Sequence, residues 1–169
     1  MARPAPSLKA KALACIAQRE HSRVELRRKL LSHIGRQLKA AASSPLALDV
    51  PVQMLAAERE VDELLDWLTA KDLLSVDRFV ETRVNARVAR FGNLRIRQEL
   101  AQHGVELDVE TAQRLKDGEL SRARTVWAKR FGTPATGAAD RARQIRFLSA
   151  RGFSAETVRR VVRGGGDED

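Results

Sequence analysis

Apolar side chains recur every three or four positions along most of the chain, a spacing that predicts α-helices throughout. Four apolar residues in the middle of the chain share one helical face, being spaced four, four and three apart: Val80, Val84, Val88 and Phe91. We therefore predict a helix over about 77–90, closed by Gly92, and a second over about 94–103. A third helix is expected after Asp108, whose side chain suits an N-cap. Helices this short need mutual packing, so 75–117 is predicted to form a compact three-helix unit.

Parts of this unit recur on both sides of it. The segment 100–105 (LAQHGV) has the same pattern as 148–153 (LSARGF), 48 positions later. Towards the N-terminus, 26–30 (LRRKL) corresponds to 96–100 (IRQEL). A period in this range is typical of helical repeat proteins, whose units bury apolar faces against their neighbours. The alternative is a single irregular helical domain with chance internal similarity.

The composition between the helical segments gives the expected boundaries. The three predicted units span 7–74, 75–117 and 118–163. Residues 40–51 (AAASSPLALDVP) have loop composition, and Pro51 is well placed to open a helix. Both termini, 1–6 and 164–169, have too little apolar content to order themselves and are expected to be disordered.

Three local signals refine the helical prediction. Ser22 and Glu25 have the spacing of a capping box, in which each side chain accepts from an exposed amide at the helix start. The lone cysteine, Cys15, excludes a disulfide within the chain and falls among apolar positions, so we expect a small core residue. Trp127 is at helical spacing from other apolar residues and is predicted to lie in the core rather than to stack on nucleic acid bases.

Charge is distributed unevenly along the chain, whose net value is +9. Residues 1–39 carry ten basic and two acidic side chains, whereas 40–74 carry two basic and seven acidic ones. The balance is +1 over 75–117 and +5 over 118–169. Arginine supplies 24 of the 31 basic residues, and its planar fork suits carboxylates and phosphates. This distribution predicts attraction to an acidic surface or to nucleic acid.

No pattern for covalent chemistry is found in the sequence. His21, His33 and His103 have no cysteine or carboxylate near them at metal-ligand spacing, so no metal site is predicted. No glycine-rich loop has the phosphate-binding pattern. We therefore expect a binding protein that is not an enzyme and needs no cofactor. No apolar run reaches the length of a membrane span, which predicts a cytoplasmic, soluble protein.

The arginines are the candidate binding residues. Arg83, Arg87 and Arg90 fall at i, i+4 and i+7, and this stripe is expected on the helix face opposite the valines, with Glu81 and Glu99 pairing with part of it. For any single arginine, a solvated face is the simpler interpretation. The complete predicted partner surface consists of Arg23, Arg27, Arg28, Arg83, Arg87, Arg90, Arg95, Arg97, Arg146 and Arg151.

Several motifs, in order, resemble the RecX family of regulators of the RecA recombinase. The segments that carry the resemblance are 8–13 (LKAKAL), 19–30 (REHSRVELRRKL), 74–79 (LSVDRF), 90–92 (RFG), 96–100 (IRQEL), Gly104 and 146–154 (RFLSARGFS). The resemblance implies an all-α fold, an elongated, curved array of three tandem three-helix repeats. It also implies a function: binding in the groove of the RecA–DNA filament, bridging protomers, and inhibiting ATP hydrolysis, coprotease activity and strand exchange. Weak non-specific DNA binding is implied as well.

The chain departs from the family pattern in two places. Residues 35–59 are longer than the usual connection between the second and third helices of the first repeat, which predicts an extended loop and helix insertion there. The turn 91–94 (FGNL) lacks the Tyr or Gly–Pro that is usual at this point, so the angle between the flanking helices does not transfer.

Two other functions compete with filament regulation. Three-helix units with a basic helix also resemble helix-turn-helix modules, which predicts a DNA-binding regulator. Against it, the positive charge is spread over both ends of the chain. The third possibility is an adaptor of helical repeats that binds an acidic protein. In each case we expect a monomer.

Overall fold

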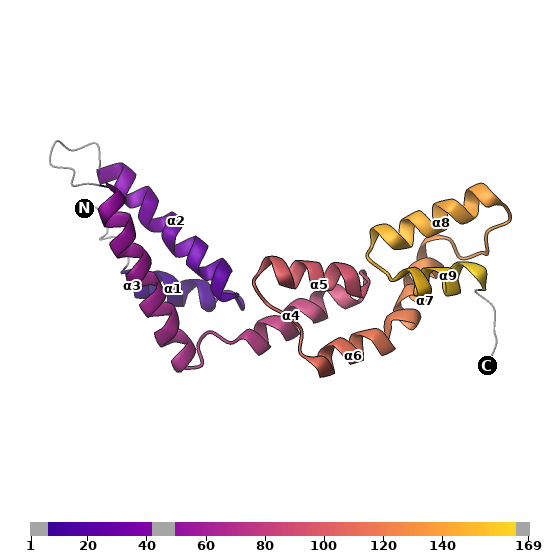
Figure 1. The fold of residues 1–169 in the computed structure, drawn as a ribbon, viewed down its shortest axis with the longest axis horizontal. Coiled ribbons are helices and arrows are strands. Elements are labelled where there is room, and N and C mark those ends of the chain that lie inside the picture. The colour runs from indigo at the N-terminus through magenta and orange to yellow at the C-terminus, as the bar shows by residue number, and fades with distance from the viewer. Residues whose placement is uncertain (1–6, 42–49, 165–169) are drawn as a thin grey trace. The chain divides into compact units, whose positions relative to one another are not determined.

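The computed structural model describes residues 7–41 and 50–164, and these two ranges contain helices and turns but no strand (Figure 1). The helices are α1 (Leu8–Ile16), α2 (Arg23–Ala41), α3 (Val50–Ala70), α4 (Val76–Val88), α5 (Asn93–Gln102), α6 (Val109–Asp117), α7 (Glu119–Arg130), α8 (Ala138–Ala150) and α9 (Ala155–Arg163). The predicted all-α class is confirmed. The disorder predicted for 1–6 and 164–169 lies, except for Gly164, outside the described residues.

The chain divides into two compact units, Met1–Phe79 and Val80–Asp169, with the boundary inside α4. We call them the N-terminal unit and the C-terminal unit, and each contains an apolar core of its own. The prediction of three units stays a prediction.

The core of the N-terminal unit is formed by α1, α2, α3 and the turn that follows α3. Its buried side chains are Ala12, Cys15, Leu26, Leu30, Val61, Leu65, Leu68 and Leu74. Cys15 is a buried free thiol, as the apolar pattern predicted. The two long helices α2 and α3 pack on each other, so most of this core lies between segments about 35 residues apart.

The predicted insertion at 35–59 is largely helical. Residues 35–41 continue α2 and 50–59 begin α3, so the described part of the insertion lengthens two packed helices and does not form a separate loop. Pro51 lies in the first turn of α3, where its missing N–H costs no hydrogen bond. The rest of the predicted loop, 42–49, lies outside the described residues.

The C-terminal unit has an apolar cluster among α7, α8 and α9. The buried members are Ala123, Val126, Trp127, Leu148, Phe153, Val158, Val161 and Val162. Trp127 lies in this core, as predicted, and its Nε1–H donates to the Gln144 Oε1 atom at 2.8 Å. This buried hydrogen bond satisfies the polar end of the indole ring.

The repeated sequence pattern forms the same turn twice. Gly104 and Gly152 both have positive φ, 69° and 80°, which glycine adopts without strain. In each turn the next residue donates back across the helix end: Val105 N to Leu100 O at 3.1 Å, and Phe153 N to Leu148 O at 3.3 Å. These are Schellman-type helix ends. The two similar segments therefore end α5 and α8 in the same way.

Helix starts are also close to those predicted. The Asp108 side chain accepts from the Thr111 amide at 2.7 Å and caps α6. The Ser22 Oγ atom accepts from the Glu25 amide at 3.1 Å, which confirms that half of the capping box. Helix α4 ends at Val88, two residues before its predicted end, because Arg90 and Phe91 both donate to the Arg87 carbonyl in a tight turn.

Candidate interaction surface

Two of the predicted binding arginines on α2 are held by acidic side chains of α3. The Arg27 Nε and Nη2 atoms donate to the two carboxylate oxygens of Asp62 at 2.8 and 3.0 Å. Arg23 pairs with Asp66 at 2.7 Å. Two side chains of the N-terminal basic block are therefore paired with the acidic block that follows it, across the α2–α3 contact. Arg23 and Arg27 are thus paired within the unit, whereas Arg28 is exposed. That these three arginines belong to a partner surface stays a prediction.

The bidentate pair changes the titration of its acidic member. The hydrogen bond from Arg27 lowers the pKa of Asp62 below its ordinary value, and the charges of Arg27 and Arg23 act in the same direction. Asp62 therefore stays ionised, and the Arg27 guanidinium stays paired with it.

The predicted arginine stripe on α4 does not lie opposite the valines. Residues three positions apart share a helix face, so Arg83 and Arg87 border Val80 and Val84. Both arginines are half-buried against α5. The Arg83 guanidinium donates to the His103 Nε2 atom at 3.2 Å.

Glu99 of α5 is the acidic partner of this region. The Arg87 Nε atom donates to the Glu99 carboxylate at 2.8 Å. The predicted pairing of Glu99 with the stripe is therefore confirmed. Arg90, at the turn after α4, is exposed and has no carboxylate partner within the described residues.

Three guanidinium groups surround the ring of Phe91. The distances from the guanidinium carbon to the ring centroid are 5.8 Å for Arg87, 5.9 Å for Arg90 and 4.5 Å for Arg95. Each lies within the range of cation–π attraction. We call Phe91 and these three arginines the Phe91 cluster. With Glu99 as its partner carboxylate, this region keeps a net charge of +2.

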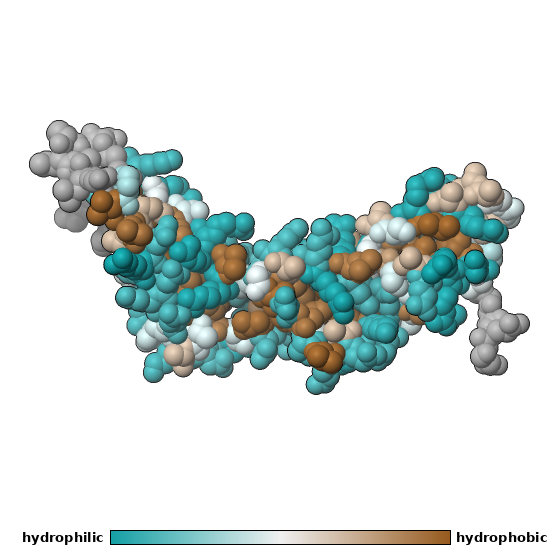
Figure 2. Space-filling view, viewed as in Figure 1, coloured by the Kyte–Doolittle hydropathy of each residue, from teal (hydrophilic) through white to brown (hydrophobic). Residues whose placement is uncertain are grey.

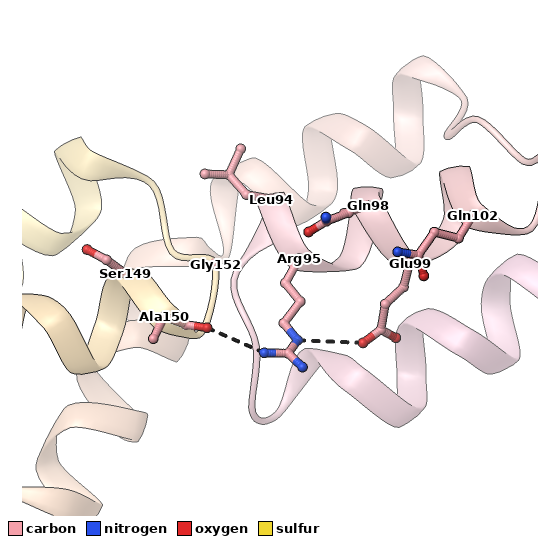
Figure 3. Close-up of a pocket in the computed structure, with 8 residues that line it drawn as sticks. All are labelled: Leu94, Arg95, Gln98, Glu99, Gln102, Ser149, Ala150 and Gly152. Atoms are coloured by element: carbon pink, nitrogen blue, oxygen red, sulfur yellow. Dashed lines mark hydrogen bonds and ion pairs between the residues drawn. The ribbon is translucent and has the colours of Figure 1, made fainter.

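An open groove of about 550 Å³ adjoins the cluster (Figure 3). One side consists of α5 residues and the other of the end of α8 and the turn after it; the lining residues are Leu94, Arg95, Gln98, Glu99, Gln102, Ser149, Ala150 and Gly152. Arg95 spans it, with 3.7 Å from its Nε atom to Glu99 and 3.4 Å from its Nη1 atom to the Ala150 carbonyl.

Two glycines bring the walls of this groove together. The Gly92 amide donates to the Arg151 carbonyl at 2.9 Å, and the Leu94 amide donates to the Gly152 carbonyl at 3.0 Å. A Cβ atom at Gly92 would lie 2.2 Å from the Gly152 carbonyl oxygen, well inside contact distance. The turn before α5 and the turn before α9 thus meet backbone to backbone, which only glycine allows.

A buried carboxylate, Glu119, fixes the same junction from the start of α7. Its Oε1 atom accepts from the Asn93 amide at 2.9 Å, which caps α5. Its Oε2 atom accepts from the hydroxyl groups of Ser154 at 2.6 Å and Thr157 at 3.0 Å, at the start of α9. The sequence did not predict this role, because Glu119 resembles an ordinary first-turn glutamate of α7 and its partners are 26 to 38 positions away.

Arg122 completes this network. Its Nη2 atom donates to the Asn93 Oδ1 atom at 2.6 Å and to the Leu115 carbonyl at 2.8 Å. Burial lowers the pKa of Arg122, and the charge of Glu119 opposes that shift. The network therefore ties α5, α6, α7 and α9 of the C-terminal unit to one another.

The other predicted arginines are dispersed. Arg97 and Arg146 are exposed on α5 and α8. Arg151 is half-buried, with its guanidinium 4.4 Å from the centroid of Phe147. The structure thus brings Arg87, Arg90 and Arg95 together around the Phe91 ring, whereas the Arg151 guanidinium is placed over the Phe147 ring. Figure 2 shows hydrophilic side chains over most of the visible face of each unit.

Comparison with known proteins identifies the family. The family model for the third three-helix domain of RecX matches residues 117–162. A regulatory protein RecX of Ralstonia pickettii is 42% identical over 160 residues, which cover 94% of this chain and 87% of that protein. The chain belongs to the RecX family.

Two further relatives extend over the same length. The regulatory protein RecX of Leptothrix cholodnii is 42% identical, covering 95% of this chain and 90% of its own. That of Chromobacterium violaceum is 36% identical over all 169 residues of this chain. The relatives are named regulatory proteins, so the chain is a member of a family of regulators.

Membrane spans and metal clusters are both missing from the part of the chain that the structure describes. No helix there is long and apolar enough to cross a membrane. No cluster of three or more histidine, cysteine, aspartate or glutamate side chains in those ranges has the arrangement of a metal site.

Proposed function

We propose that this protein regulates the RecA recombinase by binding in the groove of the RecA–DNA filament. Bound there, it bridges neighbouring protomers and inhibits ATP hydrolysis, coprotease activity and strand exchange. The observation that carries the proposal is membership of the RecX family over nearly the whole chain.

The C-terminal unit has the physical properties that bridging requires. The Gly92–Gly152 contact and the Glu119 network hold α5 to the α7–α9 part of the unit through hydrogen bonds between distant segments. A ligand that contacts two protomers resists their rearrangement only if it does not itself deform. Binding that favours one filament geometry then shifts the population towards that geometry and slows ATP turnover.

The repeat organisation, the oligomeric state and the cellular location of the protein are inferred together with its function. We infer three repeats over 7–74, 75–117 and 118–163, acting as a monomer. The surface arginines support weak, sequence-independent contact with DNA phosphates. A partner on chromosomal DNA implies a cytoplasmic location. Since the proposed action is a restraint on the ATP hydrolysis of the partner, this protein itself needs neither catalysis nor a cofactor.

RecA ATP hydrolysis on single-stranded DNA tests the function directly. We expect a steep loss of hydrolysis when this protein is added well below one molecule per RecA subunit, because one bound molecule restrains several linked protomers. The control is the same titration with heat-unfolded protein, checked by circular dichroism.

The absence of any effect at stoichiometric amounts of folded protein would contradict the proposal. A duplex-sequence selection would then test the helix-turn-helix alternative. A site-specific DNA-binding regulator discriminates among duplex sequences by about three orders of magnitude or more at physiological salt.

A further inference from the structure

The Phe91 cluster is a cationic site held in place before any partner binds. Its arginines contact one ring, and two of them also share the Glu99 carboxylate. Arg87 is tightly held at 2.8 Å from Glu99, whereas Arg95 is 3.7 Å from it and Arg90 has no carboxylate partner among the described residues. Arg95 also donates to the Ala150 carbonyl at 3.4 Å. Its remaining N–H groups and the Arg90 guanidinium are therefore available to an incoming anion.

The adjoining groove offers both hydrogen-bond donors and acceptors. Gln98 and Gln102 are exposed along α5, and their amide groups have no partner within the described residues. Ser149 adds an exposed hydroxyl group on the opposite wall (Figure 3). An amide side chain can pair with both the N–H and the C=O of a peptide backbone, whereas a phosphodiester backbone presents acceptors alone.

The Glu99 carboxylate also distinguishes between these ligands. It lies in the groove beside Arg95, where it would repel a backbone that carries a negative charge at every nucleotide. An extended peptide can place one acidic side chain on Arg90 and Arg95 and leave its uncharged backbone next to Glu99. Charge complementarity therefore favours an acidic peptide segment over nucleic acid.

We propose that the Phe91 cluster and this groove form the docking site for an acidic, extended segment of the recombinase surface. The inference rests on the proposed function and specifies which surface of this protein is used and what chemistry it recognises. An incoming carboxylate takes over Arg95 from its long contact with Glu99, while Arg87 keeps Glu99 in place. Glu99 is then an internal competitor that limits the affinity of the site.

The test uses the full chain and three sets of substitutions. R90Q/R95Q removes the two available charges without placing a new carboxylate beside Glu99. R124Q/R160Q is the matched control, since Arg124 and Arg160 are exposed on α7 and α9 of the same unit. E99Q removes the competing carboxylate. Affinity is measured by fluorescence anisotropy for RecA filaments on single-stranded DNA and, separately, for the naked DNA.

We expect R90Q/R95Q to weaken filament binding about tenfold relative to the control, which corresponds to the loss of one charge-assisted contact. Naked DNA binding should fall no further than in R124Q/R160Q. E99Q should bind filaments a few times more tightly than the unchanged chain, a gain that misfolding cannot produce.

Three outcomes would overturn the assignment. Equal filament binding by R90Q/R95Q and R124Q/R160Q would remove this surface while leaving the proposed function standing. An equal loss on filaments and naked DNA would identify nucleic acid as the ligand. If the unchanged chain neither binds filaments nor alters ATP hydrolysis, the proposed function fails and the docking site fails with it.

Discussion

His21 lies buried between α1 and α2 and is surrounded mainly by cations. Its Nε2 atom accepts from the Lys29 ammonium group at 2.8 Å, so its Nδ1–H is the group that faces the Arg19 carbonyl at 2.8 Å. Burial lowers the pKa of His21 below 6.5, and the charges of Arg19 and Lys29 lower it further, against the Arg19 carbonyl and Glu25, which raise it. His21 is therefore neutral in the folded N-terminal unit at neutral pH.

Acidification should destabilise the N-terminal unit through this residue. Below pH 6.5 the unfolded chain binds a proton at His21 that the folded chain resists, so the free energy of unfolding falls as the pH falls. We expect the N-terminal unit to unfold at a lower urea concentration at about pH 5.5 than at about pH 7.5. Its unfolding is measured by the fluorescence of Trp67 in a W127F background. In H21N, whose amide can still donate to the Arg19 carbonyl, this difference should largely disappear. An unchanged pH dependence in H21N would contradict the argument.

Glu25 titrates in a separate and lower range. Burial alone would raise its pKa, but the hydrogen bond and charge of Arg19, with further cationic neighbours, lower it to about 2. Its stabilising contribution is therefore present at neutral pH and is lost only between about 4.5 and 2. The His21 experiment stays above this window.

At the scale of elements, the two units hold their helices in different ways. In the N-terminal unit, the side chains of α2 and α3 meet through ion pairs and a long apolar seam. In the C-terminal unit, the turns before α5 and α9 touch through their backbones at Gly92 and Gly152. The second arrangement leaves no room for a single methyl group at Gly92.

Gly92→Ala should therefore destabilise the C-terminal unit. The added Cβ atom would lie 2.2 Å from the Gly152 carbonyl oxygen, and separating the turns would break the hydrogen bonds made by the Gly92 and Leu94 amides. We expect a loss of about 2 kcal/mol or more in the free energy of unfolding. The measurement is urea unfolding followed by Trp127 fluorescence in a W67F background.

Gly35→Ala is the control for this substitution. Gly35 is inside α2 with no atom within 4 Å of the added methyl group, so alanine should stabilise the N-terminal unit by about 0.5–1 kcal/mol. A neutral effect of Gly92→Ala would show that the two turns separate readily.

At the scale of the molecule, charged side chains form ion pairs and hydrogen bonds within the units and also lie exposed on their surfaces. In the +9 chain, two arginines of the N-terminal basic block, Arg23 and Arg27, are paired internally with Asp66 and Asp62. Arg87, Arg90 and Arg95 are grouped around Phe91, whereas arginines such as Arg97 and Arg146 are exposed singly. The internal carboxylate Glu119 has a different role, because it joins helix starts that come from separate parts of the C-terminal unit.

Glu119→Gln should loosen this junction. An amide has one acceptor oxygen where the carboxylate has two, so it cannot accept from both the Asn93 amide and the hydroxyl groups of Ser154 and Thr157. If the oxygen keeps the Asn93 amide, the hydroxyl groups must turn round to accept from the NH2 group, and the charge-assisted hydrogen bonds are lost. We expect a loss of about 1–3 kcal/mol in the stability of the C-terminal unit, from urea unfolding followed by Trp127 fluorescence. The matched control is Glu156→Gln, an exposed first-turn residue of α9 that should change stability by less than about 0.5 kcal/mol.

The helical class, several helix starts and ends, and much of the core could be predicted from the amino-acid sequence. Helix periodicity, the Asp108 cap, the glycine turns at Gly104 and Gly152 and the burial of Trp127 depend on residues a few positions apart, so a linear pattern contains them. The RecX resemblance was visible for the same reason, since its motifs are short and occur in order.

Which arginines are ion-paired could not be predicted from the sequence, because it depends on how the helices pack. Arg23 and Arg27 have the same local sequence character as Arg28, but Asp62 and Asp66 reach them from a helix 35 or more positions away. The Gly92–Gly152 contact and the Glu119 network also join segments that are distant in the sequence. Such pairings depend on how helices pack, because the free energy of an ion pair or a cap depends on where its partner lies in space.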